Sequence, residues 1–254
     1  EISGGYIVKQ DNTGRNGAGV ITGQEVRLHF EEPGESKLTT GQRRWMVHYL
    51  ECLERALFGR EFRDPRQGYA AYLDVDSFID FHWFVEVARN ADGYWLRQFM
   101  HKDRGQKLAM GPLWDWDNAF GNPYFGTQRT NGWRFEEGAG LDYAWYHRMF
   151  EDPDFLQRYM DRWAELRSSV FATSNVLATF DRIILKDVAL ALRRNAKRWE
   201  SASRHTVLRS QAGVSYSDEV LELQQWLKRR LAWIDSQEFQ KPVVSTGVAT
   251  FEHL

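Results

Sequence analysis

Strand-like and helix-like spacings of hydrophobic residues occupy different parts of the chain. Residues 5–9 and 25–30 are short apolar runs of the kind that form strands, and the Gly- and Asn-rich segment 11–23 between them predicts a loop. Residues 94–101 and 107–114 are two further runs with the aromatic and apolar content of strands, separated by a polar segment that contains a glycine. The second pair of runs predicts an antiparallel β-hairpin.

Two helices are expected between these pairs of strands. Apolar side chains at helical spacing follow the threonines at 39–40, either of which can cap a helix, and Gly59 stands where that helix would end. A second helix is predicted over residues 78–88, because Ser77 and Asp80 have the spacing of a capping box. The first half of the chain therefore mixes strands with helices.

Helical spacing dominates the rest of the chain. Asp152 is expected to cap a helix that begins at Pro153, since proline suits the first position of a helix. Further helices are predicted over residues 174–199 and 218–235. The basic residues 228–230 lie in the C-terminal half of the last helix, where positive charge favours the helix dipole, and we interpret them as a solvated face.

These elements predict an α+β fold. A small antiparallel β layer, with its hairpin at about 94–114, is expected to pack with a mainly helical C-terminal half. The length of 254 residues suits one large domain or two small ones, and we expect a single domain over 1–254. In this division residues 1–142 are the mixed part, 143–240 the helical part and 241–254 a tail.

Composition narrows the range of functions. The chain has 33 basic and 35 acidic side chains and a formal charge of −2, whereas a protein that binds nucleic acid non-specifically would be more basic. The longest uncharged apolar stretches are a few residues long, too short for a membrane span. The single cysteine, Cys52, excludes an internal disulfide and a zinc site built from cysteines.

The candidate chemistry lies at the two ends of the predicted hairpin. Asp92 comes twelve residues before Arg104 in the turn and Asp115 eleven residues after it, so antiparallel pairing places the two aspartates side by side. Converging carboxylates, with Asn90 and Asn118 nearby, suit a hard cation such as Mg²⁺. The alternative is structural, because Asp and Asn also cap turns at strand ends.

Two further acids belong to the same region. Asp117 shares an extended segment with Asp115, so it could hold a metal or face solvent. Glu86 lies one helical turn before Asn90, where it could orient the Asp92 loop, accept a metal-bound water, or pair with an arginine at 89 or 97.

The residues around this site resemble the spore-coat-protein-H-like (CotH) kinases. The resemblance rests on DVDSFIDF at 74–81, EVARNADGY at 86–94 and KLAMGPLWDWDNAFGN at 107–122. It continues in the motifs DPDF and RWAELR within 152–167 and RNAKRW at 194–199, so it covers most of the chain. Within the family the sequence is most similar to secreted or surface-associated bacterial members.

The resemblance implies a diverged protein kinase that binds ATP with Mg²⁺ or Mn²⁺ and transfers phosphate to a protein acceptor. Asp92 matches the family's catalytic aspartate, and Asp115 matches the aspartate that holds the metal. We therefore expect Asp92 as the catalytic residue and Asp115 and Asp117 as metal ligands, with Asn90, Arg97, Gln98, Asn118 and Glu86 in supporting or nucleotide-binding roles.

The sequence also departs from the family pattern. Where many relatives carry an asparagine for a second metal, this chain has Arg97, which cannot bind a cation. Either Arg97 contacts phosphate, or it points outward and Gln98 turns in. The family's nucleotide-clasping elements are expected upstream of Glu1, so the chain by itself would lack them and could be inactive.

Two other functions are compatible with the same residues. Exposed rings such as Trp95, Trp116 and Trp133 would serve a surface module that binds carbohydrate or protein, although most of the 11 tryptophans are expected in the core. Asp92 and Asp115 could also act as the acid and base of a glycoside hydrolase, which needs two carboxylates about 5–10 Å apart.

Overall fold

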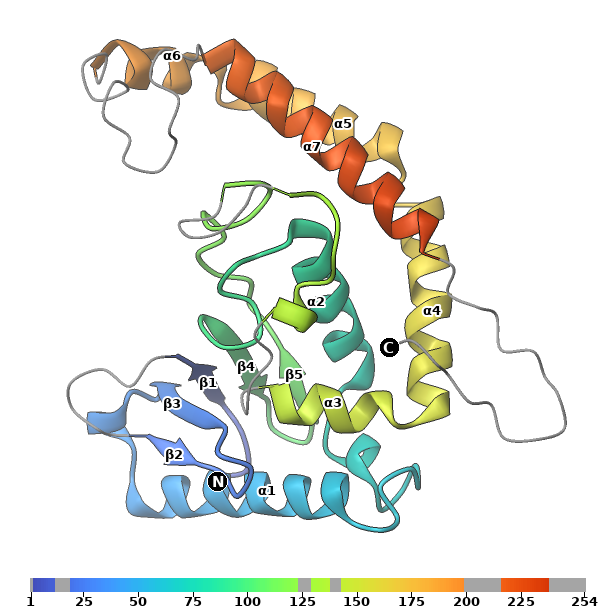
Figure 1. The fold of residues 1–254 in the computed structure, drawn as a ribbon. Coiled ribbons are helices and arrows are strands. Elements are labelled where there is room, and N and C mark those ends of the chain that lie inside the picture. The colour runs from blue at the N-terminus through green and yellow to red at the C-terminus, as the bar shows by residue number, and fades with distance from the viewer. Residues whose placement is uncertain (1, 12–18, 123–128, 138–142, 199–215, 238–254) are drawn as a thin grey trace, which may run out of the picture.

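A five-stranded antiparallel sheet and a set of helices make up the computed structural model, which describes residues 2–11, 19–122, 129–137, 143–198 and 216–237 (Figure 1). Helix α1 runs beneath the sheet, α2 stands beside it, and α4 rises at one side toward α5, α6 and α7. The predicted α+β class is confirmed. The predicted tail over 241–254 lies outside the described residues.

The sheet joins the amino-terminal strands to the hairpin. Its strand order is β2-β3-β1-β4-β5, so β1 lies at the centre and pairs with β3 on one side and β4 on the other. The short strand β2 falls inside the segment that we predicted as a loop. The strands are β1 (Tyr6–Gln10), β2 (Val20–Ile21), β3 (Arg27–Glu32), β4 (Gln98–Lys102) and β5 (Leu108–Met110).

The hairpin is confirmed, but its strands are shorter than predicted. Strand β4 begins only at Gln98, because Tyr94 and Arg97 have φ angles of 77° and 56°, which are incompatible with a strand. Strand β5 ends at Met110, before Gly111 with a φ of 118°. The residues on both sides of the hairpin are therefore loop, and these loops carry the aspartates.

Most helices lie where apolar spacing predicts them. Thr39 caps α1 through a complete capping box with Gln42. The predicted helix over 174–199 is instead α5 and α6, separated by a π-helical turn at Ile183–Asp187 after which Val188 leaves helical geometry. The helices are α1 (Thr40–Phe58), α2 (Val75–Ala88), α3 (Ala144–Phe150), α4 (Pro153–Ser168), α5 (Thr173–Arg182), α6 (Ala189–Arg198) and α7 (Tyr216–Ser236), with 3₁₀ turns at Glu35–Lys37, Tyr69–Ala71 and Phe135–Glu137.

The predicted start of α2 is wrong by one turn. Asp74, not Ser77, is the cap, and its carboxylate accepts the amide of Ser77 at 3.3 Å. The Ser77 hydroxyl accepts the Met110 amide at 3.0 Å and so ties α2 to β5. Asp80 makes no capping box, because its carboxylate pairs with Arg162 of α4.

Helix α2 is the centre of the core. His82 is fully buried, and its two ring nitrogens lie 2.8 Å from the Tyr159 hydroxyl and 2.7 Å from the Tyr143 hydroxyl. The next residue, Trp83, stacks on Tyr159 and on Trp163 of α4. Burial holds the pKa of His82 well below its ordinary value of 6.5, so the core contains a neutral imidazole.

The stability of the protein should therefore fall on mild acidification. Below pH 6.5 the unfolded chain binds a proton at His82 that the folded chain does not, which costs about 1.4 kcal/mol of unfolding free energy per pH unit. We expect a His82→Gln variant, which keeps polar contacts to the two tyrosines but cannot titrate, to lose this slope. Urea unfolding of both proteins between pH 7 and 5 measures the difference, and parallel pH profiles would contradict it.

Candidate functional site

The Asp92 loop is fixed at the end of α2. Arg89 ends the helix in a left-handed conformation with a φ of 50°, and the side chain of Asn90 accepts the Asp92 amide at 3.0 Å. Gly93 follows where a Cβ atom would lie 2.4 Å from a methyl group of Val85, so only glycine fits without displacing the helix. Asp92 is consequently held in a nearly buried position, with 7% of its area exposed.

The segment after β5 is hydrogen-bonded to this loop. The Ala91 amide donates to the Asn118 carbonyl at 2.9 Å, and the Phe120 amide donates to the Ala88 carbonyl at 2.7 Å. Asp115 itself has a φ of 61°, which turns the chain sharply as it leaves the sheet. The predicted meeting of the two hairpin ends is therefore present in the backbone.

The side chain of Arg97 joins three aspartates. Its Nη1 atom lies 3.0 Å from Asp92 Oδ2, 3.0 Å from Asp115 Oδ2 and 3.3 Å from Asp117 Oδ1. The amide group of Asn118 donates to the same Asp92 oxygen at 3.2 Å. We call these five residues the carboxylate cluster. Because two carboxylates contact one nitrogen atom, Asp92 and Asp115 are close neighbours, as the hairpin spacing predicts.

Gln98 lies outside the carboxylate cluster. It is 3% exposed, and its Nε2 donates to Gln10 Oε1 at 3.1 Å, while Gln10 donates to the Tyr94 carbonyl. Of the two orientations considered from the sequence, the structure thus has Arg97 turned toward the aspartates and Gln98 turned toward the neighbouring strand.

Glu86 is a fully buried carboxylate beneath the Asp92 loop. Its Oε1 accepts the Tyr94 hydroxyl at 2.8 Å and the Phe135 amide at 3.1 Å. Its Oε2 accepts the Arg134 amide at 2.8 Å and lies 3.3 Å from Arg230 Nη2. Burial raises the pKa of Glu86, while Arg230 and the hydrogen-bond donors act in the opposite direction.

The predicted partners of Glu86 were wrong, since the partner is Arg230 of α7 rather than the arginine at 89 or 97. Arg230 is fully buried, so the prediction that 228–230 form a solvated face fails at this residue. Its guanidinium also donates to the carbonyls of Glu86, Thr130 and Gly132. Burial lowers the pKa of Arg230 to about 10. Arg230 recurs at helical spacing with the buried residues at 226, 227, 231 and 234, and that periodicity could have identified it.

Arg134 connects the buried Glu86 to the loop that carries Asp92. Its amide binds Glu86, and its side chain donates to the carbonyls of Asn90 at 3.0 Å and Ala91 at 2.6 Å. The two carbonyls belong to the residues directly before Asp92. No pattern in the sequence predicts the role of Arg134, because this residue lies on an irregular segment without periodicity.

The donor atoms of the carboxylate cluster have the chemistry that Mg²⁺ or Mn²⁺ requires. Three carboxylates are hard oxygen ligands, and a guanidinium nitrogen already stands between them as a cation. Within the described ranges, no group of three or more His, Cys, Asp or Glu side chains has the arrangement to hold a metal ion. The carboxylates thus have the chemistry for a divalent cation but are not arranged around one, because Arg97 occupies the central position.

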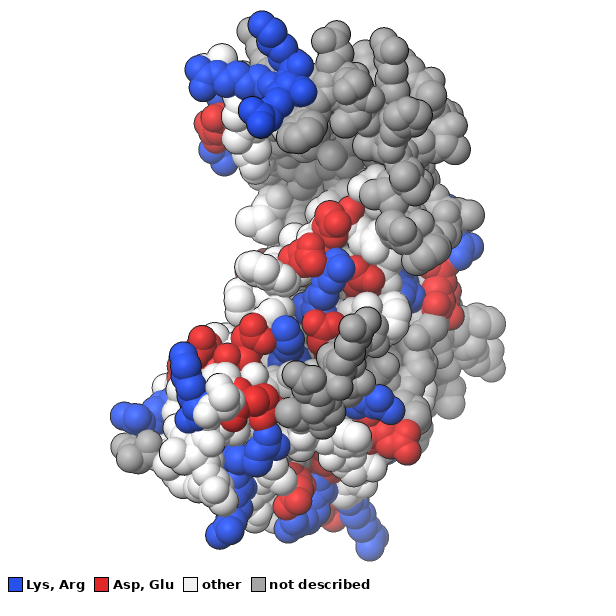
Figure 2. All heavy atoms as spheres, turned by 90° about the vertical axis from the view of Figure 1, so that its left-hand side faces the viewer, with Lys and Arg blue, Asp and Glu red and all other residues white. Residues whose placement is uncertain are grey.

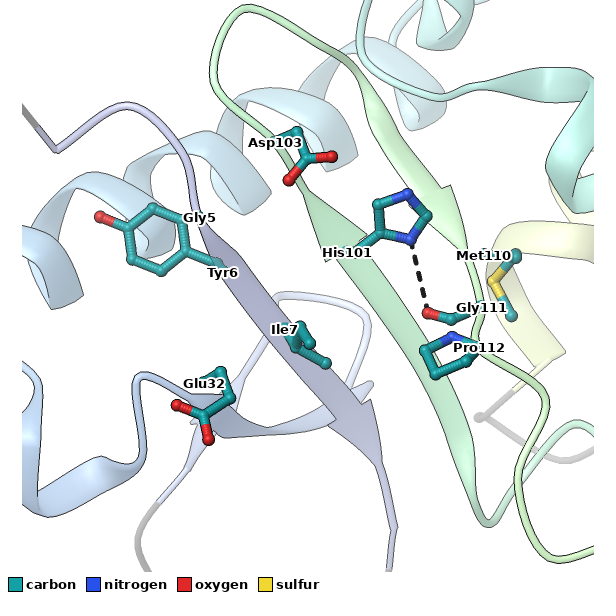
Figure 3. Close-up of a pocket in the computed structure, with 9 residues that line it drawn as sticks. All are labelled: Gly5, Tyr6, Ile7, Glu32, His101, Asp103, Met110, Gly111 and Pro112. Carbon is teal, nitrogen blue, oxygen red and sulfur yellow. Dashed lines mark hydrogen bonds between the residues drawn. The ribbon is translucent and has the colours of Figure 1, made fainter.

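A pocket of about 610 Å³ lies on the outer face of the sheet, the face turned away from α1 (Figure 3). Ile7 of β1, Met110 and Pro112 give it an apolar floor, and His101 of β4 lies among them. The carboxylates of Glu32 and Asp103 stand at its edges. The pocket is therefore apolar inside and acidic at its rim.

Charges of both signs alternate over much of the described surface in Figure 2, and Lys and Arg gather at its upper end, over α6. No helix among the described residues is long and apolar enough to cross a membrane.

The predicted exposed rings differ in their burial. Trp95 is 40% exposed and Trp116 is partly buried, whereas the prediction for Trp133 is wrong because its ring packs in the core at 8% exposure. Trp114, which was not predicted, is 61% exposed.

A comparison with protein families matches residues 2–234 to the CotH kinase protein family. The chain belongs to the CotH kinase family. The match spans nearly the whole chain and confirms the resemblance that the motifs at 74–81, 86–94 and 107–122 indicate. No curated protein matches the sequence. Membership of this family suggests a kinase-like fold and, in general terms, the use of nucleotide and metal.

Removing Arg230 should destabilise the protein strongly. An Arg230→Met substitution leaves Glu86 as an unpaired buried charge, which costs about 3–5 kcal/mol of unfolding free energy. Adding Glu86→Gln should recover part of this loss, because the uncompensated charge is then gone. Denaturant unfolding of both single variants and the double variant measures the coupling free energy.

Arg229→Met is the matched control on the exposed face of the same helix, and we expect it to change stability by less than about 0.5 kcal/mol. Additive effects of the two substitutions at 86 and 230 would show that the buried pair is not coupled.

Proposed function

We propose that this CotH-family chain carries the catalytic site of an ATP- and divalent-metal-dependent phosphoryl transferase that acts on a protein acceptor. The observation that supports this most is the convergence of Asp92 and Asp115 from two separate loops onto one cationic nitrogen. Phosphoryl transfer depends on positioning and on charge neutralisation, and paired carboxylates next to a cation supply both.

Asp92 is assigned the role of the catalytic base. Its backbone is held by Asn90 and Arg134, and its carboxylate is oriented by Asn118, so the side chain is fixed before a substrate arrives. In this position the carboxylate orients the acceptor hydroxyl and takes up its proton. Protein kinases use an aspartate in the same way.

Asp115 and Asp117 are assigned to metal binding. Both carboxylates face the same point in space as Asp92, and their side chains are 41% and 75% exposed, so an ion can reach them from solvent. When bound, Mg²⁺ or Mn²⁺ neutralises charge on the phosphate oxygens. Tight turns at Asp115 and Gly121, with φ angles of 61° and 79°, fix the segment that carries both residues.

The pocket on the outer face of the sheet is assigned to the nucleotide base. Strand β4 leads from Arg97 to His101, and four residues of extended chain span about 13 Å, which is comparable with the distance from the base of a nucleotide to its terminal phosphates. The apolar floor suits a planar ring, and Arg97 together with a metal bound to the cluster would receive the phosphates at the other end of the strand.

Two side chains lie along this path from pocket to cluster. The ring of Phe99 contacts Trp114, and the Nζ atom of Lys9 lies 5.8 Å from the centre of the Phe99 ring. Lys9 is also paired with Glu31 at 3.0 Å. The outer face therefore offers a cation between the proposed base pocket and the carboxylate cluster, where the phosphate chain of a nucleotide would pass.

Removal of a single carboxylate should abolish activity. We expect Asp115→Asn, which keeps the size of the side chain but loses its charge, to weaken metal-dependent ATP binding and to lower phosphoryl transfer at least about 100-fold. Calorimetry with Mg-ATP and a radiolabelled phosphoryl-transfer assay measure the two effects.

Asp161→Asn, an exposed aspartate on α4, serves as the control and should behave like the unmodified protein. Absence of Mg-ATP binding by the folded wild-type chain would contradict the proposed function of this chain.

A negative charge placed in the pocket should weaken nucleotide binding without changing the affinity of the carboxylate cluster for metal. Ile7→Glu puts a carboxylate into the apolar floor of a pocket that already has an acidic rim, and we expect at least tenfold weaker ATP binding, equivalent to about 1.4 kcal/mol. Ile21→Glu makes the same change on β2 at a residue that is already 63% exposed and should leave ATP affinity unchanged. Equal ATP affinity of the two variants would place the base elsewhere.

A further inference from the structure

We propose that Arg97 is a built-in counter-cation of the carboxylate cluster. A divalent metal must displace the Arg97 side chain from the cluster, and the displaced guanidinium then binds the phosphate of a bound nucleotide. The inference deepens the proposed function and rests on it for the identity of the phosphate donor. It predicts that metal and nucleotide bind cooperatively, with each increasing the affinity for the other.

The geometry of Arg97 is that of a cation held by ligands. One nitrogen atom makes contacts of 3.0, 3.0 and 3.3 Å with three different carboxylates, and it also lies 3.5 Å from the Asp115 carbonyl. Arg97 adopts a left-handed backbone conformation with a φ of 56°, as does Asp115 with 61°. A non-glycine residue keeps this conformation only where surrounding contacts favour it, and here those contacts are ionic.

Metal and guanidinium cannot occupy the cluster together. Mg²⁺ binds carboxylate oxygens at about 2.1 Å, and an ion at the centre of the cluster would need the oxygens that Arg97 contacts, Asp92 Oδ2, Asp115 Oδ2 and Asp117 Oδ1. Two cations among three carboxylates would also repel each other at close range. Metal binding to Asp115 and Asp117 therefore requires that Arg97 withdraw, and any affinity measured for the metal alone is reduced by the cost of that withdrawal.

The side chain of Arg97 is able to withdraw. One third of its area is exposed to solvent, and two of its partners, Asp115 and Asp117, are themselves exposed. A guanidinium group binds phosphate oxygens as readily as carboxylates, so a nucleotide that enters the cluster supplies an equivalent partner. The nucleotide removes the competitor of the metal, and by thermodynamic reciprocity the metal strengthens nucleotide binding to the same extent.

The first experiment measures Mn²⁺ binding without nucleotide, from the electron paramagnetic resonance signal of the free ion. Arg97→Gln removes the positive charge, and we expect at least tenfold tighter Mn²⁺ binding than in the wild-type protein. Arg97→Lys keeps a cation and should remain within about threefold of wild type. The matched control is Arg44→Gln on α1, the same chemical change at an exposed arginine, which should not alter Mn²⁺ affinity.

The second experiment repeats the titration with a non-hydrolysable ATP analogue present. In the wild-type protein the analogue should tighten Mn²⁺ binding more than it does in Arg97→Gln, because only the wild-type protein has a competitor to remove. Thermal unfolding of all variants in metal-free buffer verifies that each is folded.

Three outcomes would overturn the proposal. Arg97→Gln binds Mn²⁺ no tighter than wild type, Arg97→Lys gains as much affinity as Arg97→Gln, or no variant binds Mn²⁺ at all. The failure of the proposed function is distinguishable from these. If the wild-type chain binds no nucleotide but Arg97→Gln still binds Mn²⁺ more tightly, the kinase assignment fails while the competition between Arg97 and metal holds.

Discussion

The buried ion pair between Glu86 and Arg230 is the interaction on which the candidate site depends. Glu86 lies in the last turn of α2 and has no contact with solvent, so its charge must be balanced inside the protein. Arg230 supplies that balance from α7, and the amide of Arg134 completes the set of donors. The Arg134 side chain binds the carbonyls that precede Asp92. The position of Asp92 is therefore linked, through Arg134, to the charge balance of the core.

In the carboxylate cluster, negative charge is also compensated by an arginine, but closer to solvent. Three carboxylates that converge would repel one another, and Arg97 offsets one of the three negative charges with a guanidinium that is one-third exposed. The buried pair is surrounded by protein and has no route for exchange. The exposed cation can be replaced by another cation at little structural cost, which makes the outer cluster suitable for a ligand that arrives and leaves.

The sequence predicts features that depend on local spacing. The hairpin spacing placed Asp92 beside Asp115, and the Thr39 and Asp152 caps follow from local hydrogen bonding. It did not predict the partner of Glu86, because that contact joins residues 144 positions apart and leaves no periodic pattern between them. The start of α2 was misplaced because Ser77 and Asp74 both satisfy capping rules, and only the packing of α2 against β5 and α4 selects one.

The separation between Glu86 and Arg230 also matters while the protein is being synthesised. At about 5–20 residues per second, a ribosome needs roughly 7–30 s to add the 144 residues between them. Throughout that interval the carboxylate of Glu86 lacks its guanidinium partner, although Arg134, which binds the carbonyls before Asp92, is already synthesised. The nascent chain therefore has the anchor of the Asp92 loop before it has the charge that balances Glu86, and the core around α2 is complete only after α7 has been synthesised.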